Sequence, residues 1–303
     1  MNKVIFVAGP TAAGKTEYAI KLANDLNGEI VSADSMQIYK YMDIGSAKPT
    51  KEEQEMAKHW LIDEIDPRNP FNVSDYQKLA KKYIYDIISR GKQPIVCGGT
   101  GLYLNSLIYD MDFSAPEGDL AYRDALIAKY QTPERLFARL RELDPDAGNE
   151  ADMNNMKRIS RYIERLEKGE DNLANFANMN KPSSEFTPIV CILNRNREVL
   201  YSRIDQRVDK LIDAGLLDEV NKLMSMGFTK DDIAMKGIGY KELMDNLPID
   251  QAIEKIKLNT RHYAKRQITW FKRYGDLAKW FDLEEDSYDN LLKYIKNKLD
   301  CTD

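Results

Sequence analysis

The chain has 303 residues, of which 43% are hydrophobic and 10% aromatic, enough to build a large core and too apolar for extended disorder. Its net charge of −5 excludes a protein that is basic over its whole surface, so a nucleic-acid-binding surface has to be local. The length predicts more than one lobe.

Targeting, membrane and disulfide signals are weak. The apolar run from Val4 to Ala8 is too short for a signal peptide, and no stretch reaches the roughly 20 apolar residues of a membrane span. The three cysteines, Cys97, Cys191 and Cys301, are far apart and lack the spacing of metal ligands. We therefore expect a cytoplasmic, monomeric protein without a membrane partner, a disulfide framework or a zinc site.

The first motif is GPTAAGKT, which fits the phosphate-loop pattern G-x-x-x-x-G-K-[ST]. It follows the strand-like run Lys3 to Ala8 and precedes a helical pattern, and a helix N-terminus with nearby glycines suits a phosphate chain. A glycine-rich turn without a ligand is the alternative, which this context disfavours. Lys15 would contact the terminal phosphates, and Thr16 would ligate Mg²⁺. The predicted diphosphate- or nucleotide-binding set is Gly9, Pro10, Thr11, Ala12, Ala13, Gly14, Lys15 and Thr16.

Further strand-like runs cover Glu29 to Ala33, Pro94 to Cys97 and Pro188 to Leu193. Asp34 directly follows the first run, and a glycine-rich segment containing Thr100 follows the second. Ligands of parallel α/β sheets bind at the carboxyl ends of the strands. We therefore expect the phosphate loop and Asp34 to lie side by side.

The charge-rich segment 112–187 has helical periodicity and separates the last two strand-like runs, so we predict a helical insertion there. The first part of the core then covers 1–111, and 188–303 completes it with C-terminal basic and aromatic helices. The predicted fold class is α/β, a P-loop parallel sheet with flanking helices, such as 74–89, plus a helical insertion domain.

Two charged helical patterns can also be interpreted as solvent-exposed helix faces without a ligand. Arg158, Arg161 and Arg165 share one helix face in the insertion, and a solvated face is the alternative. A single helix is expected over Val199 to Val220, where Arg207 lies on a polar side that is equally typical of a solvated face.

The segment Lys255 to Gly275 has seven Lys or Arg, no Asp or Glu, and interleaved aromatic residues. Basic groups with aromatics suit a phosphate backbone and unstacked bases, although some of the aromatics must pack in the core. A nucleoside or small-molecule kinase has the same loop but does not need this segment. An RNA-binding module with a purely structural loop is the third hypothesis.

The chain resembles the tRNA dimethylallyltransferase (tRNA isopentenyltransferase) family of bacterial type. The resemblance rests on GPTAAGKT at 9–16, ADSMQIY at 33–39, MDIGSAKPT at 42–50, CGGTGLYL at 97–104, GIGYKE at 237–242 and TRHYAKRQITWF at 260–271. It implies transfer of a dimethylallyl group from dimethylallyl diphosphate to N6 of the adenosine 3′-adjacent to the anticodon in tRNA, with Mg²⁺ as cofactor and diphosphate as leaving group. A prenyltransferase acting on free adenine nucleotides is the nearest alternative, and the arginine face of the insertion argues against it.

The resemblance also assigns roles to residues. Asp34, Thr11 and Arg207 would be catalytic, with Asp34 accepting the N6 proton and Arg207 contacting the diphosphate. Lys157 stands where family members often carry Gln, which keeps a polar donor and adds a charge. The residues that would contact the tRNA anticodon stem-loop are Asp34, Ser35, Met36, Gln37, Thr100, Arg123, Lys157, Arg158, Ile159, Ser160, Arg161, Lys236, Gly237, Ile238, Gly239, Tyr240, Lys241, Thr260, Arg261, His262, Tyr263, Ala264, Lys265, Arg266 and Gln267.

Overall fold

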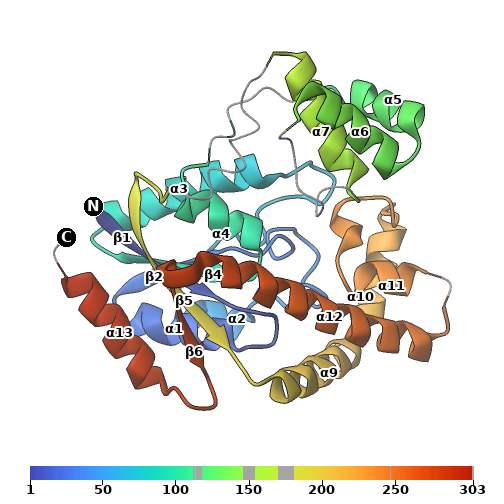
Figure 1. The fold of residues 1–303 in the computed structure, drawn as a ribbon. Coiled ribbons are helices and arrows are strands. Elements are labelled where there is room, and N and C mark those ends of the chain that lie inside the picture. Colours follow the sequence, from blue (N-terminus) through green and yellow to red (C-terminus); the bar gives the residue numbers. More distant parts are fainter. Residues whose placement is uncertain (112, 114–117, 146–153, 170–180, 246, 302–303) are drawn as a thin grey trace. The chain divides into compact units, whose positions relative to one another are not determined.

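The chain divides into two compact units in the computed structural model, which describes residues 1–303 except 112, 114–117, 146–153, 170–180, 246 and 302–303 (Figure 1). The first unit comprises Met1–Ile108 and Ser183–Asp303, and the second is Tyr109–Pro182. The insertion expected over 112–187 is therefore described only in part.

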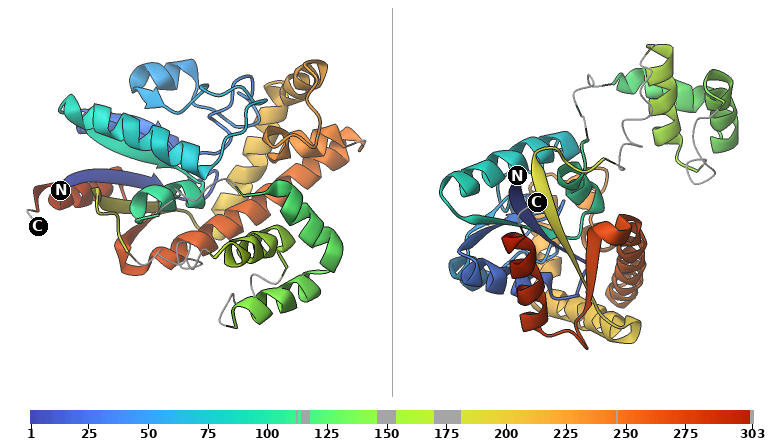
Figure 2. Two further views of the ribbon diagram at one scale, coloured as in Figure 1. Left: turned by 90° about the horizontal axis from the view of Figure 1, so that it is seen from above. Right: turned by 60° about the vertical axis from the view of Figure 1, so that its left-hand side comes forward.

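The first unit is built on a six-stranded sheet with the strand order β3-β2-β4-β1-β5-β6. All the strand pairings are parallel, which confirms the predicted α/β class with a parallel sheet. The central strands are apolar runs because both faces of the sheet are covered by helices, as the two views of Figure 2 show. The strands are β1 (Asn2–Ala8), β2 (Gly28–Ser32), β3 (His59–Trp60), β4 (Gln93–Gly98), β5 (Phe186–Asn194) and β6 (Ala278–Asp282).

Helices α1 and α13 pack against one face of the sheet, where Leu22 and Leu291 are fully buried in the same apolar cluster as Ile5 and Ile95. The helix predicted over 74–89 begins one residue earlier, because Asn72 caps it together with Asp75. The helices of this unit are α1 (Lys15–Asp25), α2 (Lys51–Met56), α3 (Val73–Ser89), α4 (Gly101–Ile108), α9 (Arg197–Asp213), α10 (Leu216–Ser225), η2 (Ala234–Lys236), α11 (Tyr240–Met244), α12 (Ile249–Phe271), η3 (Lys272–Leu277) and α13 (Tyr288–Asp300).

One expectation about the chain is corrected, and one strand was not predicted. The single helix expected over Val199 to Val220 is two helices, because the chain breaks at Gly215, whose φ of 96° lies in the left-handed region. Strand β6 extends the sheet beyond β5, although the sequence of its region gave no strand signal. Its residues, AKWFD, contain no β-branched side chain, so its position is set by pairing with β5.

The second unit contains α5 (Leu120–Tyr130), α6 (Pro133–Leu143) and α7 (Met156–Glu167), packed around a core that includes Leu136 and Ile163. Glu164 is buried there. It accepts hydrogen bonds from Arg123, Lys168 and the Asp119 N–H. Burial would raise the pKa of Glu164, but these bonds hold it at about 2. The buried carboxylate thus joins α5 to α7.

The carboxyl ends of β1, β2, β4 and β5 meet at one edge of the sheet. The chain continues from these ends into the phosphate loop, Asp34, the glycine-rich segment from Gly98 and Arg195. Four segments that are far apart in the sequence therefore converge there. Within the described residues, no helix combines the length and apolar character needed to cross a bilayer.

Candidate functional site

The phosphate loop connects β1 to α1, and its carbonyl groups are held by cationic side chains. Lys15 donates to the Pro10 carbonyl at 2.8 Å, and Arg203 of α9 donates to the Ala12 carbonyl at 2.9 Å. Arg195, which follows β5, donates to the Ala13 carbonyl at 2.9 Å. Since these bonds come from within the protein, the loop is shaped before any ligand binds.

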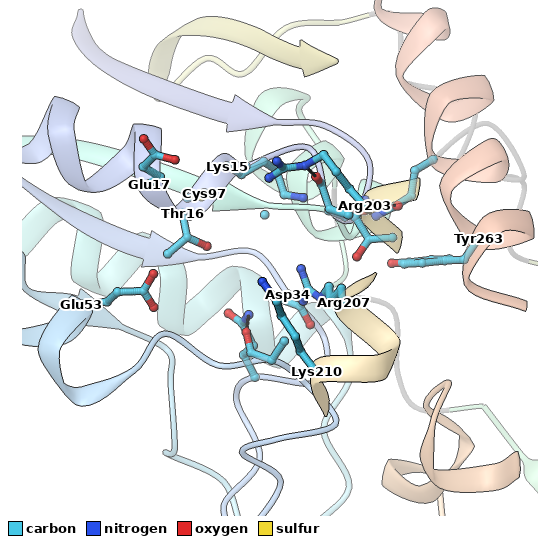
Figure 3. A pocket seen from close by; sticks show the side chains of 18 of the residues that line it. Lys15, Thr16, Glu17, Asp34, Glu53, Cys97, Arg203, Arg207, Lys210 and Tyr263 are labelled. Atoms are coloured by element: carbon cyan, nitrogen blue, oxygen red, sulfur yellow. Dashed lines mark hydrogen bonds between the residues drawn. The ribbon is translucent and has the colours of Figure 1, made fainter. Parts of the chain in front are cut away.

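The loop lines a cavity of about 410 Å³ that is rich in positive charge (Figure 3). Lys15, Arg203, Arg207 and Lys210 line it from α1 and α9. None of these four forms an ion pair with an acidic residue in the part of the chain that the structure describes. Several cations without carboxylate partners in one cavity form a site suited to a polyanion.

Burial is the main cause of the perturbed titration of two of these cations. The pKa of Lys15 is lowered to about 8, mainly by burial and also by the charge of Arg207, while Cys97 and Asp34 act in the opposite direction. Burial also lowers the pKa of Arg207, and the carboxylate of Asp34 opposes that shift. Both cations are incompletely solvated, so an anion that replaces their lost hydration is stabilised.

A second cavity, of about 450 Å³, adjoins the first. Its lining is more apolar and includes Met36, Tyr103, Leu216 and Ile256. The two cavities have four lining residues in common. These are Thr11, Asp34, Arg207 and Tyr263. The three residues predicted to be catalytic thus lie where an anion-binding cavity meets an apolar one.

Asp34 is oriented by its own backbone turn and by the neighbouring loop. Its Oδ1 accepts the Met36 N–H at 2.9 Å, an Asx turn that directs the carboxyl group. The next residue, Ser35, donates its N–H to the Thr100 hydroxyl at 3.0 Å. The structure therefore brings Asp34 and Thr100 together, as expected from the strand ends.

Glu219 of α10 holds the loop that follows Asp34, and sequence reasoning missed it. Its Oε2 accepts the N–H groups of Asp43 and Ile44, both at 2.8 Å, while its Oε1 accepts the Gly45 N–H at 3.0 Å and the Tyr240 hydroxyl at 2.7 Å. One carboxylate thus links the segments MDIGSAK and GIGYKE, which are almost 200 residues apart. No spacing in the sequence indicates this contact.

The basic segment 255–275, formed by most of α12 and the start of η3, has two chemically distinct halves. In its first half, Lys255, Lys257 and Arg261 are ion-paired with Asp245, Asp209 and Asp205. Further along, other basic residues form no ion pair with any residue that the structure describes. These are Lys265, Arg266, Lys272 and Arg273. The basic segment is therefore neutralised at one end and available to an external anion at the other.

Some residues of the predicted tRNA-contacting set have buried side chains, namely Ile159, Ser160, Tyr240, Ala264 and Gln267. In the free protein these side chains pack inside the fold, and their contact with tRNA stays a prediction. Arg123 is bound to Glu164 and is also largely buried. By contrast, Lys157, Arg158 and Arg161 of α7 are exposed.

The cavity residues fit a magnesium ion that is bound mainly through a ligand's phosphates. No group of three His, Cys, Asp or Glu placed to hold a metal occurs among the described residues. Mg²⁺ commonly uses one or two protein groups together with waters and phosphate oxygens, so such a group is not needed. Thr16, Asp34 and Glu53 line the cavity and could supply those protein groups (Figure 3).

Comparison with known proteins gives consistent matches over the whole chain. The family model described as IPP transferase matches residues 37–274. A protein from Clostridioides difficile named tRNA dimethylallyltransferase is 50% identical over 309 residues, covering 99% of this chain and 97% of that protein. A protein of the same name from Acetivibrio thermocellus is 46% identical over 306 residues, covering 98% and 96%.

Two solved structures also match this chain over almost its whole length. The full-length tRNA isopentenylpyrophosphate transferase from Bacillus halodurans is 38% identical, with a TM-score of 0.74 and coverage of 99% of this chain and 96% of that one. A eukaryotic dimethylallyltransferase acting on tRNA is 28% identical, with a TM-score of 0.82 and coverage of 98% and 80%. Since the family model spans most of the chain and the relatives match it almost end to end, the chain belongs to the IPP transferase family.

Proposed function

We propose that this protein transfers a dimethylallyl group from dimethylallyl diphosphate to N6 of the adenosine 3′-adjacent to the anticodon in tRNA, releasing diphosphate. The junction of the two cavities is the observation that carries the proposal. A cationic cavity suits the diphosphate, and an apolar one suits an adenine and a five-carbon chain. The names of the relatives support the same reaction.

The residues at the junction fit the charge changes of this reaction. As the bond between C1 and the diphosphate oxygen breaks, negative charge grows on the leaving group, and Lys15 and Arg207 line the cavity that receives it. As N6 bonds to C1, the amine becomes acidic, and its proton passes to Asp34. A carboxylate is a weak base, so the larger contribution of Asp34 is to orient N6.

Mg²⁺ is part of the proposal. Thr16 would hold it with the donor's phosphates, where it would neutralise charge on the diphosphate. The adenine has to leave its stack to reach the junction, at a cost of a few kcal/mol that is smallest in a single-stranded loop. An anticodon loop meets that requirement. We also propose that the protein works in the cytoplasm as a monomer.

The test is an assay of purified protein with Mg²⁺, dimethylallyl diphosphate and unmodified tRNA, followed by nucleoside mass spectrometry. We expect N6-dimethylallyladenosine in the tRNA and no product with AMP or ATP as acceptor. A kinase would instead consume ATP with a mononucleotide acceptor and without RNA. That result, or prenylation of free nucleotides alone, would contradict the proposal.

Binding of the diphosphate is expected to depend on the proton of Lys15. Since burial lowers the pKa of Lys15 to about 8, the free protein loses this charge as the pH rises through 8, and its affinity for inorganic diphosphate falls. The Lys15→Arg variant keeps its charge to far higher pH. Deprotonation of the diphosphate affects both proteins equally, so calorimetry should show a ratio of wild-type to variant affinity that declines above pH 8. A constant ratio would contradict this assignment.

The two halves of the basic segment 255–275 are expected to contribute unequally to tRNA binding. Replacing Lys265 and Arg273 with methionine should weaken tRNA binding by about tenfold at low salt and lower the slope of log affinity against log salt by about 1 to 2. The matched control is Lys257→Met, because Lys257 is already paired with Asp209 and Glu254. Filter binding measures the tRNA affinity of both. Equal losses of tRNA affinity in the control and the double variant would contradict the division into a neutralised half and a half available to tRNA.

A further inference from the structure

Gln267 lies on the inner side of α12, and both ends of its side-chain amide are hydrogen-bonded to loops of the anion cavity. Its Oε1 accepts the backbone N–H of Thr11 at 2.8 Å, and its Nε2 donates to the Gly99 carbonyl at 2.9 Å. The residue is only 5% exposed. It therefore joins the phosphate loop to the segment that follows β4.

The approach of α12 to these loops depends on the absence of side chains there. A Cβ on Gly99 would lie 2.3 Å from Gln267 Nε2, closer than atoms can approach without displacement. One turn further along α12, the Trp270 indole donates to Oδ1 of Asn105 in α4 at 3.4 Å, and the hydroxyl of Tyr274 in η3 donates to the same atom at 2.7 Å. The inner side of α12 thus packs on these two loops and on α4.

Gln267 also contributes to the junction between the two cavities. Gln267 and Tyr263 both line the anion cavity, and Gln267 accepts the Thr11 N–H there. Gln267 is therefore bonded to Thr11, one of the four residues common to both cavities. The Thr11 N–H is satisfied by Gln267, so this amide is not among those left for a phosphate.

We propose that Gln267 is a positioning residue of the donor cavity, which fixes Thr11 against the Gly99 carbonyl, and that it is not a contact residue for tRNA. This assignment rests on the proposed prenyl transfer for its kinetic consequence. Its structural basis is the pair of hydrogen bonds. A buried amide with both ends bonded to the protein has no surface to offer to an RNA. Without it, Thr11 would keep its place in the chain but lose the bond that fixes its orientation.

The first test is Gln267→Met, which keeps the length of the side chain and removes both hydrogen bonds. Losing one or two net hydrogen bonds predicts a rise of about 10- to 100-fold in the KM for dimethylallyl diphosphate, with the tRNA dissociation constant changed by less than about twofold. Gln251→Met makes the same chemical change on the exposed part of α12, away from the cavities, and should leave both parameters unchanged. Lys265→Met should weaken tRNA binding and leave the KM for dimethylallyl diphosphate unchanged.

A second variant disrupts the contact between Gln267 and Gly99 by changing Gly99. Gly99→Ala inserts the Cβ that displaces the Gln267 amide, so it should also raise the donor KM and leave tRNA affinity unchanged. If both variants break one contact, the double variant should be no worse than the more damaging single one. Circular dichroism melts would identify a variant that has lost its fold, and the other variant then carries the test.

The outcomes separate this inference from the proposed function. If Gln267→Met bound tRNA more weakly and kept the donor KM of the wild type, Gln267 would be an RNA contact and the assignment would be overturned. Prenylation of tRNA by the wild-type protein would still support the proposed reaction in that case. If the wild-type protein transferred no prenyl group, the proposed function would be wrong. Calorimetry with inorganic diphosphate would still test the contact, since Gln267→Met should bind it at least tenfold more weakly than wild type, and equal affinities would overturn the assignment.

Discussion

Replacing Asp34 with asparagine is expected to lower kcat by about 10³-fold, within the range that a positioned proton acceptor contributes. The variant removes the negative charge that orients N6 and receives its proton. It keeps the Oδ1 atom that accepts the Met36 N–H at 2.9 Å, so the turn that shapes this loop is retained. Single-turnover prenylation of tRNA, measured over a range of pH, reports the loss directly.

Asp34→Ala supplies the matched comparison because it removes the charge and the turn together. Its tRNA affinity should fall more than that of Asp34→Asn, while both should lose orders of magnitude in turnover. Equal losses of turnover and tRNA affinity in Asp34→Asn would contradict the assignment of Asp34 as proton acceptor and orienting group, and would make it an RNA contact alone.

Arg207→Met is expected to lower kcat/KM by about 10²- to 10³-fold, the loss typical of removing one donor that stabilises a developing oxyanion. Arg207 lies at the junction, where burial has already lowered its pKa, so a diphosphate gains more from it than from a fully hydrated cation. Steady-state kinetics with varied dimethylallyl diphosphate measures the effect.

The same helix offers controls for Arg207. Arg207→Lys keeps the charge but loses the planar donor set, so an intermediate loss is expected. Arg197→Met changes an exposed arginine of α9 that stacks on Tyr201, and it should leave kcat/KM unchanged. If Arg207→Met behaved like Arg197→Met, Arg207 would belong to the solvated face of the helix, and its role at the leaving group would be wrong.

The sequence predicted the parts of the site that follow local rules. A phosphate-loop pattern between a strand and a helix, and polar residues directly after strands, have defined positions in a parallel sheet. For this reason Lys15, Asp34 and Thr100 were brought together correctly. The central strands were placed within a few residues for the same reason, since buried parallel strands are short apolar runs.

The remaining features depend on contacts between distant segments. Nothing in the spacing of the chain indicates that Glu219 binds the N–H groups of the loop after Asp34, or that Gln267 binds the phosphate loop. The family resemblance marked the whole stretch 260–267 as an RNA contact. In the folded chain this stretch contains exposed cations and one buried, inward-facing amide. The sequence could not predict this division, because burial depends on the tertiary fold.

The most direct measurement is a structure of the protein with Mg²⁺, an unreactive thiolodiphosphate analogue of dimethylallyl diphosphate and an anticodon stem-loop. The account predicts the diphosphate in the phosphate loop beside Lys15 and Arg207, with C1 of the donor and N6 of an unstacked adenine meeting at Asp34. An analogue bound outside the loop, or an adenine that approaches from a side remote from Asp34, would contradict it.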